Sequence, residues 1–403
     1  MTASPLLPLF LTIFVDVLGF TLVIPLLPYY ALHFGATPLQ VGLLNASYAA
    51  VQLLSGPLLG SLSDRLGRKR VLLASQLGLL VGFAILGGAQ SLWMLFAGRL
   101  VAGATAGNLT IAQAYISDVT TPENRTRSFG IIGIAFGMGF LVGPPLAGVM
   151  AHRFGYAAPP LAAAALSALS ATLTFFLLPE VRPSEVFSAP RRTLSFGRFL
   201  EIPAARTRLL QFFCYILSFA TLIGGVPLFL ERRFHYNVEQ TGYIFAFSGL
   251  IGAIIQGGLL GRLARALGEE KLAALGLLTM LSHAALGWID QLSLLLVVVA
   301  VGGFGTSVVR PSLTTLITRS VSPEQQGAAL GVSQSLGSLG QIIGTVSAGA
   351  LIGRDLLPAF GILSAVFALI GVAVGLGAPS VAMATVDPAM DEPRPSESST
   401  SSG

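Results

Sequence analysis

The chain has 403 residues, of which 53% are hydrophobic and only 10% are charged. A soluble protein carries about 25% charged residues, so this chain has too few polar side chains to cover a water-soluble surface. The single cysteine, Cys214, excludes a disulfide within the chain and a cysteine-bound metal cluster. Glycine is abundant, at 47 residues, and small residues let helices pack closely in a bilayer. The composition therefore predicts an all-α membrane protein.

Apolar stretches between charged or proline-rich breaks predict twelve transmembrane helices, since one span needs about 20 residues. In the first half they cover residues 5–32, 38–62, 70–89, 92–117, 128–151 and 157–179. In the second half they cover residues 207–230, 238–262, 270–289, 292–318, 326–350 and 356–379. The first stretch has no lysine or arginine before it and is too long for a signal peptide, so it predicts a retained first helix.

These breaks divide the chain into four parts. Residues 1–179 are predicted to form an N-terminal six-helix bundle, and residues 207–379 a C-terminal one. Residues 180–206 hold prolines and a basic run, which predicts a cytoplasmic linker. Residues 380–403 are rich in proline, acidic residues and serine, which predicts a disordered cytoplasmic tail.

Positive charge alternates from loop to loop. One set of loops, with the linker and tail, holds Arg65, Arg68, Lys69, Arg70, Arg125, Arg127, Arg182, Arg191, Arg192, Arg198, Arg206, Arg208, Arg262, Arg265, Lys271, Arg319 and Arg394. The other set holds only Arg153, Arg232, Arg233 and Arg354. The positive-inside rule makes the first set cytoplasmic. The sequence therefore predicts a multi-pass protein of the inner (plasma) membrane with both termini in the cytoplasm. The same distribution explains the net charge of +5 without a nucleic-acid partner.

The two halves repeat each other at a shift of about 201 residues. Gly60, Gly67, Gly139, Gly143 and Gly148 match Gly261, Gly268, Gly340, Gly344 and Gly349. Six helices per half is an even number, so the halves share one orientation and are related by a pseudo-two-fold axis along the membrane normal. This arrangement favours a substrate site near the midplane and alternating access.

The loop after the second predicted helix has the sequence GSLSDRLGRKR, residues 60–70. Its glycines permit close packing, and its basic residues hold the loop in the cytoplasm. The pattern closely resembles motif A of the major facilitator superfamily. Three further segments are similar to signatures of the twelve-helix drug–proton antiporters within it, and most of all to the tetracycline–proton antiporter group. They are DVLGFTLVIPLLP at 16–28, LWMLFAGRLVAGATAG at 92–107 and GMGFLVGPPLAG at 137–148.

The resemblance implies a role for each matching position. Asp64 would meet the start of the eleventh helix near residues 325–328 and, with Arg68 and Asp118, lock the outward-open state. Gly139, Gly143 and Pro144 would shape the fifth helix against the opposite half. The implied gating residues are Gly60, Asp64, Arg65, Gly67, Arg68, Asp118, Gly139, Gly143, Pro144 and Gly148. Tetracycline exporters carry a histidine and an aspartate where this chain has Gly252 and Leu281, which argues against tetracycline as the physiological substrate.

Charged residues inside the predicted spans are functional candidates, because a charge in the bilayer is costly unless it is paired or protonated. Asp16 lies about 16 Å along the first helix, close to the bilayer centre. It is predicted either to carry protons or to make a structural hydrogen bond. Arg99 keeps its proton. It is predicted to take part in proton coupling, with a static ion pair as the alternative.

Further polar and aromatic residues are candidates for a substrate cavity. Arg310 lies about 13 Å from Arg319 along the tenth helix. There it either faces the cavity and attracts anionic or carbonyl-rich substrates, or it snorkels or pairs with backbone carbonyls. His283 either titrates near neutral pH or packs as a neutral group. The complete predicted cavity set is Asn108, Gln113, Phe136, Phe140, Tyr243, Phe247, His283, Arg310 and Gln341.

No nucleotide-binding P-loop occurs in the sequence, so an ion gradient is the predicted energy source. The predicted function is proton-coupled export of small, largely apolar compounds by alternating access, in a monomer that needs no metal or other cofactor. The alternative is proton-coupled transport of a sugar or an anionic metabolite. A membrane-embedded enzyme is disfavoured, because the four histidines are scattered and no paired carboxylates lie within the spans.

Overall fold

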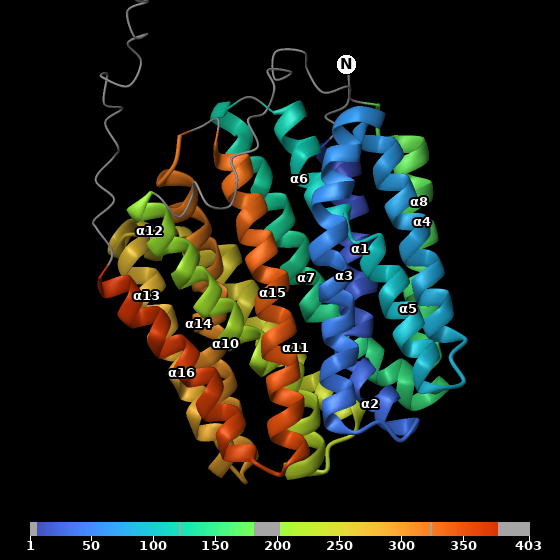
Figure 1. Ribbon diagram of the computed structural model, residues 1–403, viewed down its shortest axis with the longest axis vertical. Helices are drawn as coiled ribbons and strands as arrows, with labels where there is room; N and C mark the ends of the chain where they lie inside the picture. The colour runs from blue at the N-terminus through green and yellow to red at the C-terminus, as the bar shows by residue number, and fades with distance from the viewer. Residues whose placement is uncertain (1–5, 121, 181–201, 323–324, 378–403) are drawn as a thin grey trace, which may run out of the picture.

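The structure is a computed structural model that describes residues 6–120, 122–180, 202–322 and 325–377. Among these residues the regular elements are all helices. The predicted linker between residues 181 and 201 and the predicted tail lie outside these ranges. The long axis of the molecule runs along the helices, with the N-terminal half in blue to green and the C-terminal half in lime to red (Figure 1).

Each predicted span of the first half corresponds to helix, and two of the spans are interrupted. The elements are α1 (Leu6–Val23), α2 (Leu26–His33), α3 (Pro38–Leu66), α4 (Arg68–Gly87), α5 (Leu92–Ala104), α6 (Asn108–Val119), α7 (Pro122–Phe154) and α8 (Ala158–Leu177). The first span divides at Pro25, which has no backbone N–H to donate to the preceding turn. The fourth span divides between Ala104 and Asn108.

The second half follows the same order. Its elements are α10 (Pro203–Phe234), α11 (Val238–Ile254), the π-helix η2 (Ile255–Leu259), α12 (Leu260–Leu267), α13 (Glu269–Thr279), the 3-10 helix η3 (Met280–Trp288), α14 (Leu292–Arg319), α15 (Gln326–Gly353) and α16 (Leu357–Leu376). Helix α10 begins at Pro203, four residues before the predicted start of the second bundle at residue 207. Proline at the first helical position explains this start.

Ten stretches of the described chain are long and apolar enough to cross a membrane. The two other predicted spans are α3 and the interrupted pair α5–α6, which fall outside that set. The protein is therefore an all-α, multi-pass membrane protein.

The backbone itself shows the internal repeat. The described residues with positive φ form three pairs separated by 200 or 201 positions: Gly35 and His235, Gly67 and Gly268, Gly155 and Asp355. Helices α3 and α11 both begin with a capping box, from Thr37 to Gln40 and from Asn237 to Gln240. Equivalent turns and caps at equivalent positions support the two-bundle arrangement that the sequence predicts.

The two halves contact each other through two symmetry-related helix pairs. Helix α3 packs on α15, and α7 packs on α11. A Cβ atom at Gly42 would lie 2.5 Å from the Thr345 carbonyl oxygen, and one at Gly242 would lie 2.7 Å from the Pro144 carbonyl oxygen. Only glycine permits such a backbone approach. In Figure 1, α3 and α15 lie side by side at the centre of the molecule.

These close contacts occur at one end of the bundle only. We call the end with Arg68, Arg208 and Arg319 the basic end, and the end with Thr37 and Asn237 the opposite end. Towards the basic end, glycines of α7, of α15 and of η2 and α12, which continue α11, face open space, since a Cβ atom added to any of them would meet nothing within 4 Å; they are Gly137, Gly257, Gly258, Gly261, Gly327, Gly331 and Gly337. The halves therefore meet at the opposite end and separate towards the basic end.

This packing predicts that Gly42→Ala destabilises the protein, because the added methyl group overlaps the Thr345 backbone. Overpacking of this kind costs about 1–3 kcal/mol. Gly56→Ala on the same helix is the control, since a Cβ there meets nothing within 4 Å. Thermal unfolding in detergent should show a lower melting temperature for Gly42→Ala than for Gly56→Ala. Equal melting temperatures would contradict the contact.

Candidate functional site

A cavity of about 280 Å³ lies between the two halves. Helices α1, α3, α4, α5, α6 and α7 line it on one side, and α10, α14 and α15 on the other. Its wall is largely apolar, with an aromatic group made of Phe20, Tyr48, Phe83, Phe136, Phe140, Phe212 and Phe219. Three charged side chains line it, namely Asp16, Arg99 and Arg310.

Asp16 is the one carboxylate among the residues that line the cavity, and amide groups hold it. Asn108 Nδ2 donates to Asp16 Oδ2 at 2.7 Å, and Gln76 Nε2 donates to the same oxygen at 3.3 Å. Gln76 also donates to Ser170 Oγ at 2.8 Å, which ties α4 to α8. Asp16 Oδ1 is buried and has no hydrogen-bond partner among the described residues. Both amides therefore bond to Oδ2, while Oδ1 is buried and accepts neither of them.

The interruption between α5 and α6 places Asn108 beside Asp16. The hydroxyl of Ser55 on α3 donates to the Gly103 carbonyl at 2.7 Å, and the Gly107 N–H donates to the Thr105 carbonyl at 2.8 Å. In an uninterrupted helix the Gly107 N–H would bond to the Gly103 carbonyl. Asn108 then starts a new helix whose first side chain reaches Asp16. The sequence showed Asn108 as a candidate but gave no sign of the interruption.

Arg99 lies on α5, nine residues before Asn108, and is only 3% exposed. Its guanidinium carbon lies 4.2 Å from the centre of the Tyr48 ring, a cation–π contact. Its Nε has no hydrogen-bond partner among the described residues. The predicted alternative of a static ion pair finds no support, because the ion pairs formed within the described part of the chain do not include Arg99.

The predicted cavity set is only partly brought together. Asn108, Phe136, Phe140, Arg310 and Gln341 line the cavity with Asp16 and Arg99. Gln113, Tyr243, Phe247 and His283 are not among the residues that line this cavity. Tyr243 is 51% exposed and its hydroxyl donates to Glu239 Oε1, because α11 turns Gly242 and Gly249 towards α7 instead.

His283 lies in a separate place. It is buried on η3, where its Nδ1 lies 3.0 Å from Ser364 Oγ, and it lines a second cavity of about 60 Å³ within the C-terminal half. The packing interpretation of His283 therefore agrees with its surroundings. Among the described residues no group of three or more histidine, cysteine or acidic side chains is placed to hold a metal ion.

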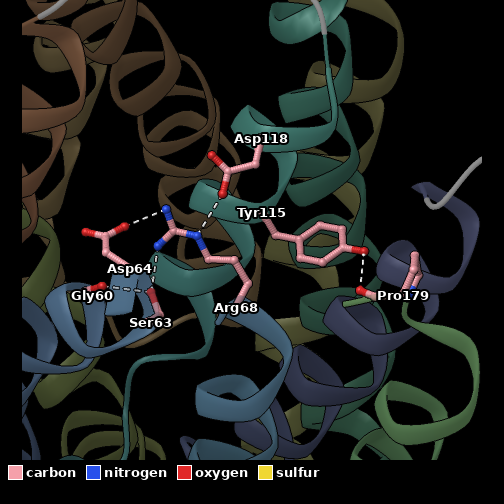
Figure 2. A network of polar contacts seen from close by, with 7 residues as sticks. All are labelled: Gly60, Ser63, Asp64, Arg68, Tyr115, Asp118 and Pro179. Carbon is pink, nitrogen blue, oxygen red and sulfur yellow. Dashed lines mark hydrogen bonds and ion pairs between the residues drawn. The ribbon is translucent and has the colours of Figure 1, made fainter. Parts of the chain in front are cut away.

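At the basic end, Arg68 joins three segments of the N-terminal half. Its Nη2 lies 2.6 Å from Asp64 Oδ1, its Nε donates to Asp118 Oδ2 at 2.8 Å, and its Nη1 donates to Ser63 Oγ at 2.7 Å. Figure 2 shows the guanidinium between the two carboxylates. The side chain is 2% exposed, so these contacts are shielded from water. Nearby, the Tyr115 hydroxyl donates to the Pro179 carbonyl at 2.9 Å.

The loop that carries this cluster depends on glycine. Gly67 is the single residue between α3 and α4, and its φ of 99° is strained for any other residue. Gly60 lies against Thr110 of α6, where a Cβ would be in ordinary contact with the Thr110 methyl group. Arg65 is exposed. Asp64 and Asp118, the two carboxylates implied to lock the outward-open state, are both paired with Arg68 within the N-terminal half.

The glycines of α7 divide between two neighbours. Gly148 approaches Glu239 of the opposite half, and the Pro144 carbonyl faces Gly242 there. Gly139 and Gly143 instead pack on Val17 and Thr21 of α1, in their own half. The expectation that these two glycines shape the contact with the opposite half is therefore wrong. They lie on a different side of α7, where the Thr21 hydroxyl donates to the Gly139 carbonyl at 3.0 Å.

The sequence analysis missed two residues, Gln76 beside Asp16 and Tyr29 at the opposite end. For Gln76, the only sign in the sequence was a polar residue within an apolar span. Tyr29 lies in the first span and contacts the C-terminal half. Its hydroxyl is within hydrogen-bond distance of the Pro227 carbonyl, the Tyr236 carbonyl and Thr241 Oγ1, at 3.2, 3.1 and 2.5 Å.

Many membrane-spanning helices in two repeated halves, with a charged cavity between them, form the architecture of a membrane transporter. The family model of the Major Facilitator Superfamily matches residues 9–282 and 209–401. The chain therefore belongs to the major facilitator superfamily of membrane transporters.

Individual relatives agree with this assignment. The class C tetracycline resistance protein of Escherichia coli is 34% identical over 353 residues, covering 83% of this chain and 86% of its own. The crystal structure of the human organic anion transporter MFSD10 superposes with a TM-score of 0.74 at 25% identity, covering 92% of this chain and 99% of its own. An inward-facing bacterial homologue of the lysosomal transporter Spinster shares the fold, with a TM-score of 0.72 at 16% identity and coverage of 93% and 97%.

The Arg68 cluster predicts a large loss of stability for Arg68→Gln, because two carboxylates lose their shared partner. Removing one member of a buried ion pair costs about 3–5 kcal/mol, and the partial exposure of Asp64 places the expected loss near the lower end. Arg65→Gln is the control on the same loop, where an exposed change stays within about 0.5 kcal/mol. Thermal unfolding in detergent distinguishes the two, and equal melting temperatures would show that the cluster is not structural.

Proposed function

We propose that the chain exports small, largely apolar compounds, of the tetracycline-like or multidrug type, in exchange for protons. The observation that carries this proposal is Asp16, a single carboxylate with an open oxygen in an aromatic cavity between the halves. Similarity to tetracycline resistance proteins over most of the chain supports the same class of cargo. Transport of a sugar or an anionic metabolite finds less support, because the wall is mostly apolar and aromatic.

Asp16 is the proposed proton carrier. Asn108 and Gln76 both donate to Oδ2, so Oδ1 is the place where a proton can be added without breaking a hydrogen bond. Arg99 keeps its charge in the same cavity wall. Proton binding and release at Asp16 then change the charge of the cavity by one unit in each cycle.

One proton is sufficient to drive such export. A charge crossing a force of about 150 mV yields about 3.5 kcal/mol. Since each decade of concentration costs about 1.4 kcal/mol, one proton sustains a gradient of roughly two decades for a neutral compound. No second coupling ion is needed.

The proposed orientation places the basic end in the cytoplasm of a plasma-membrane protein, with both termini on that side. The halves separate towards this end and meet at the opposite end, so the conformation corresponds to a cavity open to the cytoplasm. Tyr29, the backbone contacts of Gly42 and Gly242, and the Thr345 hydroxyl on the Gly42 carbonyl close the outer side. A monomer encloses the whole cavity.

Alternating access then requires the outer contacts to open and the basic end to close. We propose that the Arg68 cluster stabilises the state in which the basic end is closed. Asp64 is held by Arg68 at the end of α3, and α15 begins at Gln326 on the other half. The N-terminus of a helix attracts a carboxylate, so closure of the basic end would bring a favourable contact between Asp64 and α15.

Asp16→Asn should abolish proton-coupled transport, because asparagine cannot carry a proton. In everted vesicles with a preformed pH gradient, addition of tetracycline or another exported drug should release protons in the wild type and not in the variant. Asp290→Asn, an exposed acid at the opposite end, is the matched control and should behave as the wild type. Unchanged proton release in Asp16→Asn would exclude Asp16 as the carrier.

The function itself is tested by drug accumulation in an efflux-deficient bacterial host. Expression of the wild type should lower the intracellular level of tetracycline or of other apolar drugs, and a protonophore should restore it. A screen in which no apolar drug is exported, while sugars or metabolites are, would replace the proposal with its alternative.

Tyr29→Phe should shift the protein towards the outward-open state, because it removes a hydroxyl that can donate to one carbonyl of the other half and accept from the Thr241 hydroxyl. Each net hydrogen bond contributes about 0.5–1.5 kcal/mol, so the outward-open population should rise several-fold. A cysteine placed in the cavity at Asn45 reports this, by its labelling in intact cells with an impermeant maleimide. Tyr243→Phe is the control, and equal labelling of the two variants would exclude Tyr29 as an outer contact.

A further inference from the structure

Arg310 is the one charged side chain that the C-terminal half contributes to the cavity wall. It lies within α14, about 13 Å from Arg319 at the basic end of the same helix. The side chain is exposed, although the residues around it on α14, Val308 and Val309, are fully buried. The exposure of Arg310 is therefore exposure to the cavity.

The guanidinium of Arg310 has no hydrogen bond or ion pair to any residue that the structure describes. Arg310 interacts electrostatically with Tyr215, whose hydroxyl donates to the Thr306 carbonyl at 3.4 Å, one turn earlier on α14. Structural arginines inside membranes pair with carboxylates or backbone carbonyls. The predicted alternative for Arg310, a pairing with backbone carbonyls, is thus absent among the described residues.

The charges of the cavity wall do not balance. Two guanidinium groups, Arg99 and Arg310, face a single carboxylate, Asp16. Asp16 and Arg99 belong to the N-terminal half, so no acid of the C-terminal half lines the wall opposite them. The cavity carries a net positive charge whichever protonation state Asp16 adopts.

The apolar surroundings of Arg310 fit the remainder of an amphipathic molecule. Phe212, Ile216 and Phe219 follow one face of α10, and Phe136 and Phe140 approach from α7. An arginine fork binds two oxygens of a carboxylate or an enolate at once, whereas a neutral apolar compound leaves it unsatisfied. The wall therefore offers one anion-binding group beside an aromatic surface.

We propose that Arg310 binds an anionic oxygen group of the exported compound, so that the preferred cargo is an amphipathic carboxylate or enolate. This inference rests on the proposed export function and specifies its substrate class. Arg310 binds the cargo from the C-terminal half, while Asp16 handles the proton in the N-terminal half. Because an anion that leaves and a proton that enters move charge in the same electrical direction, transport of such a cargo dissipates the membrane potential.

The test uses a panel of aromatic carboxylic acids with their methyl esters, since each pair differs only in the charge and one methyl group. Purified protein is reconstituted in proteoliposomes with an imposed pH gradient, and transport is measured by mass spectrometry. The wild type should transport acids of the panel with a higher kcat/KM than their esters. Arg310→Gln should lower kcat/KM for the acids at least tenfold and change that for the esters less than threefold.

Two further variants separate binding from folding. Arg319→Gln removes the same charge from the same helix outside the cavity wall and should leave the acid-to-ester ratio unchanged. Arg310→Lys keeps the charge without the planar fork and should recover part of the acid transport. Retained ester transport shows that Arg310→Gln is folded.

Each outcome assigns the failure to one proposal. If the wild type transports the panel, Asp16→Asn abolishes that transport and Arg310→Gln leaves the acid-to-ester ratio unchanged, Arg310 does not bind the anion and the export function stands. A wild type that transports esters and rejects every acid likewise overturns the anion inference alone. If no member of the panel and no drug is transported by the wild type, the export function itself is wrong, and the substrate inference falls with it.

Discussion

The close approach of the two halves at the opposite end is the constraint on which the remaining structure depends. Gly42 and Gly242 occupy equivalent places in the repeat, and each lets a backbone carbonyl of the other half come closer than any side chain permits. Apolar residues of both halves, among them Leu27, Val41, Leu228 and Ile352, belong to one buried cluster, so apolar packing accompanies the backbone contacts. The same helices separate towards the basic end, and the cavity occupies the space between them.

A second constraint is the placement of polar groups near the middle of the spans. A carboxylate at Asp16 needs donors, and continuous apolar helices supply few. The break before Asn108 provides one. The Ser55 hydroxyl of α3 donates to the Gly103 carbonyl, and the next helix starts at Asn108, whose side chain donates to Asp16. Non-helical backbone within a membrane protein is tolerated where it is buried or lines a cavity. The interruption in the fourth span satisfies that condition, since Ala106 and Asn108 both line the cavity.

The sequence was sufficient to predict the membrane class, the positions of the helices and the superfamily. Hydropathy is strong over some 20 residues, and motif A depends on residues that adjoin each other in the chain. Contacts between distant segments were harder to predict. Gly139 and Gly143 were placed against the wrong neighbour because a glycine shows that something approaches closely and not which helix does so. Tyr29 was missed because its partners lie about 200 residues away, two of them backbone carbonyls that the sequence does not distinguish.

The repeat also shows where the two halves have diverged. Backbone conformation has persisted even where the residue changed, since His235 and Asp355 keep the positive φ of Gly35 and Gly155. Charge has not persisted: Asp64 and Asp118, which bind Arg68, correspond to Arg265 and Arg319 in the second half. In the cavity the same divergence separates an acid with hydrogen-bonded amides in one half from a solitary arginine in the other. A shared backbone with unlike charges is what the proposed exchange requires. Two similar halves can rock about one axis, while in this proposal the proton and the cargo bind to different groups and need not compete for the same atoms.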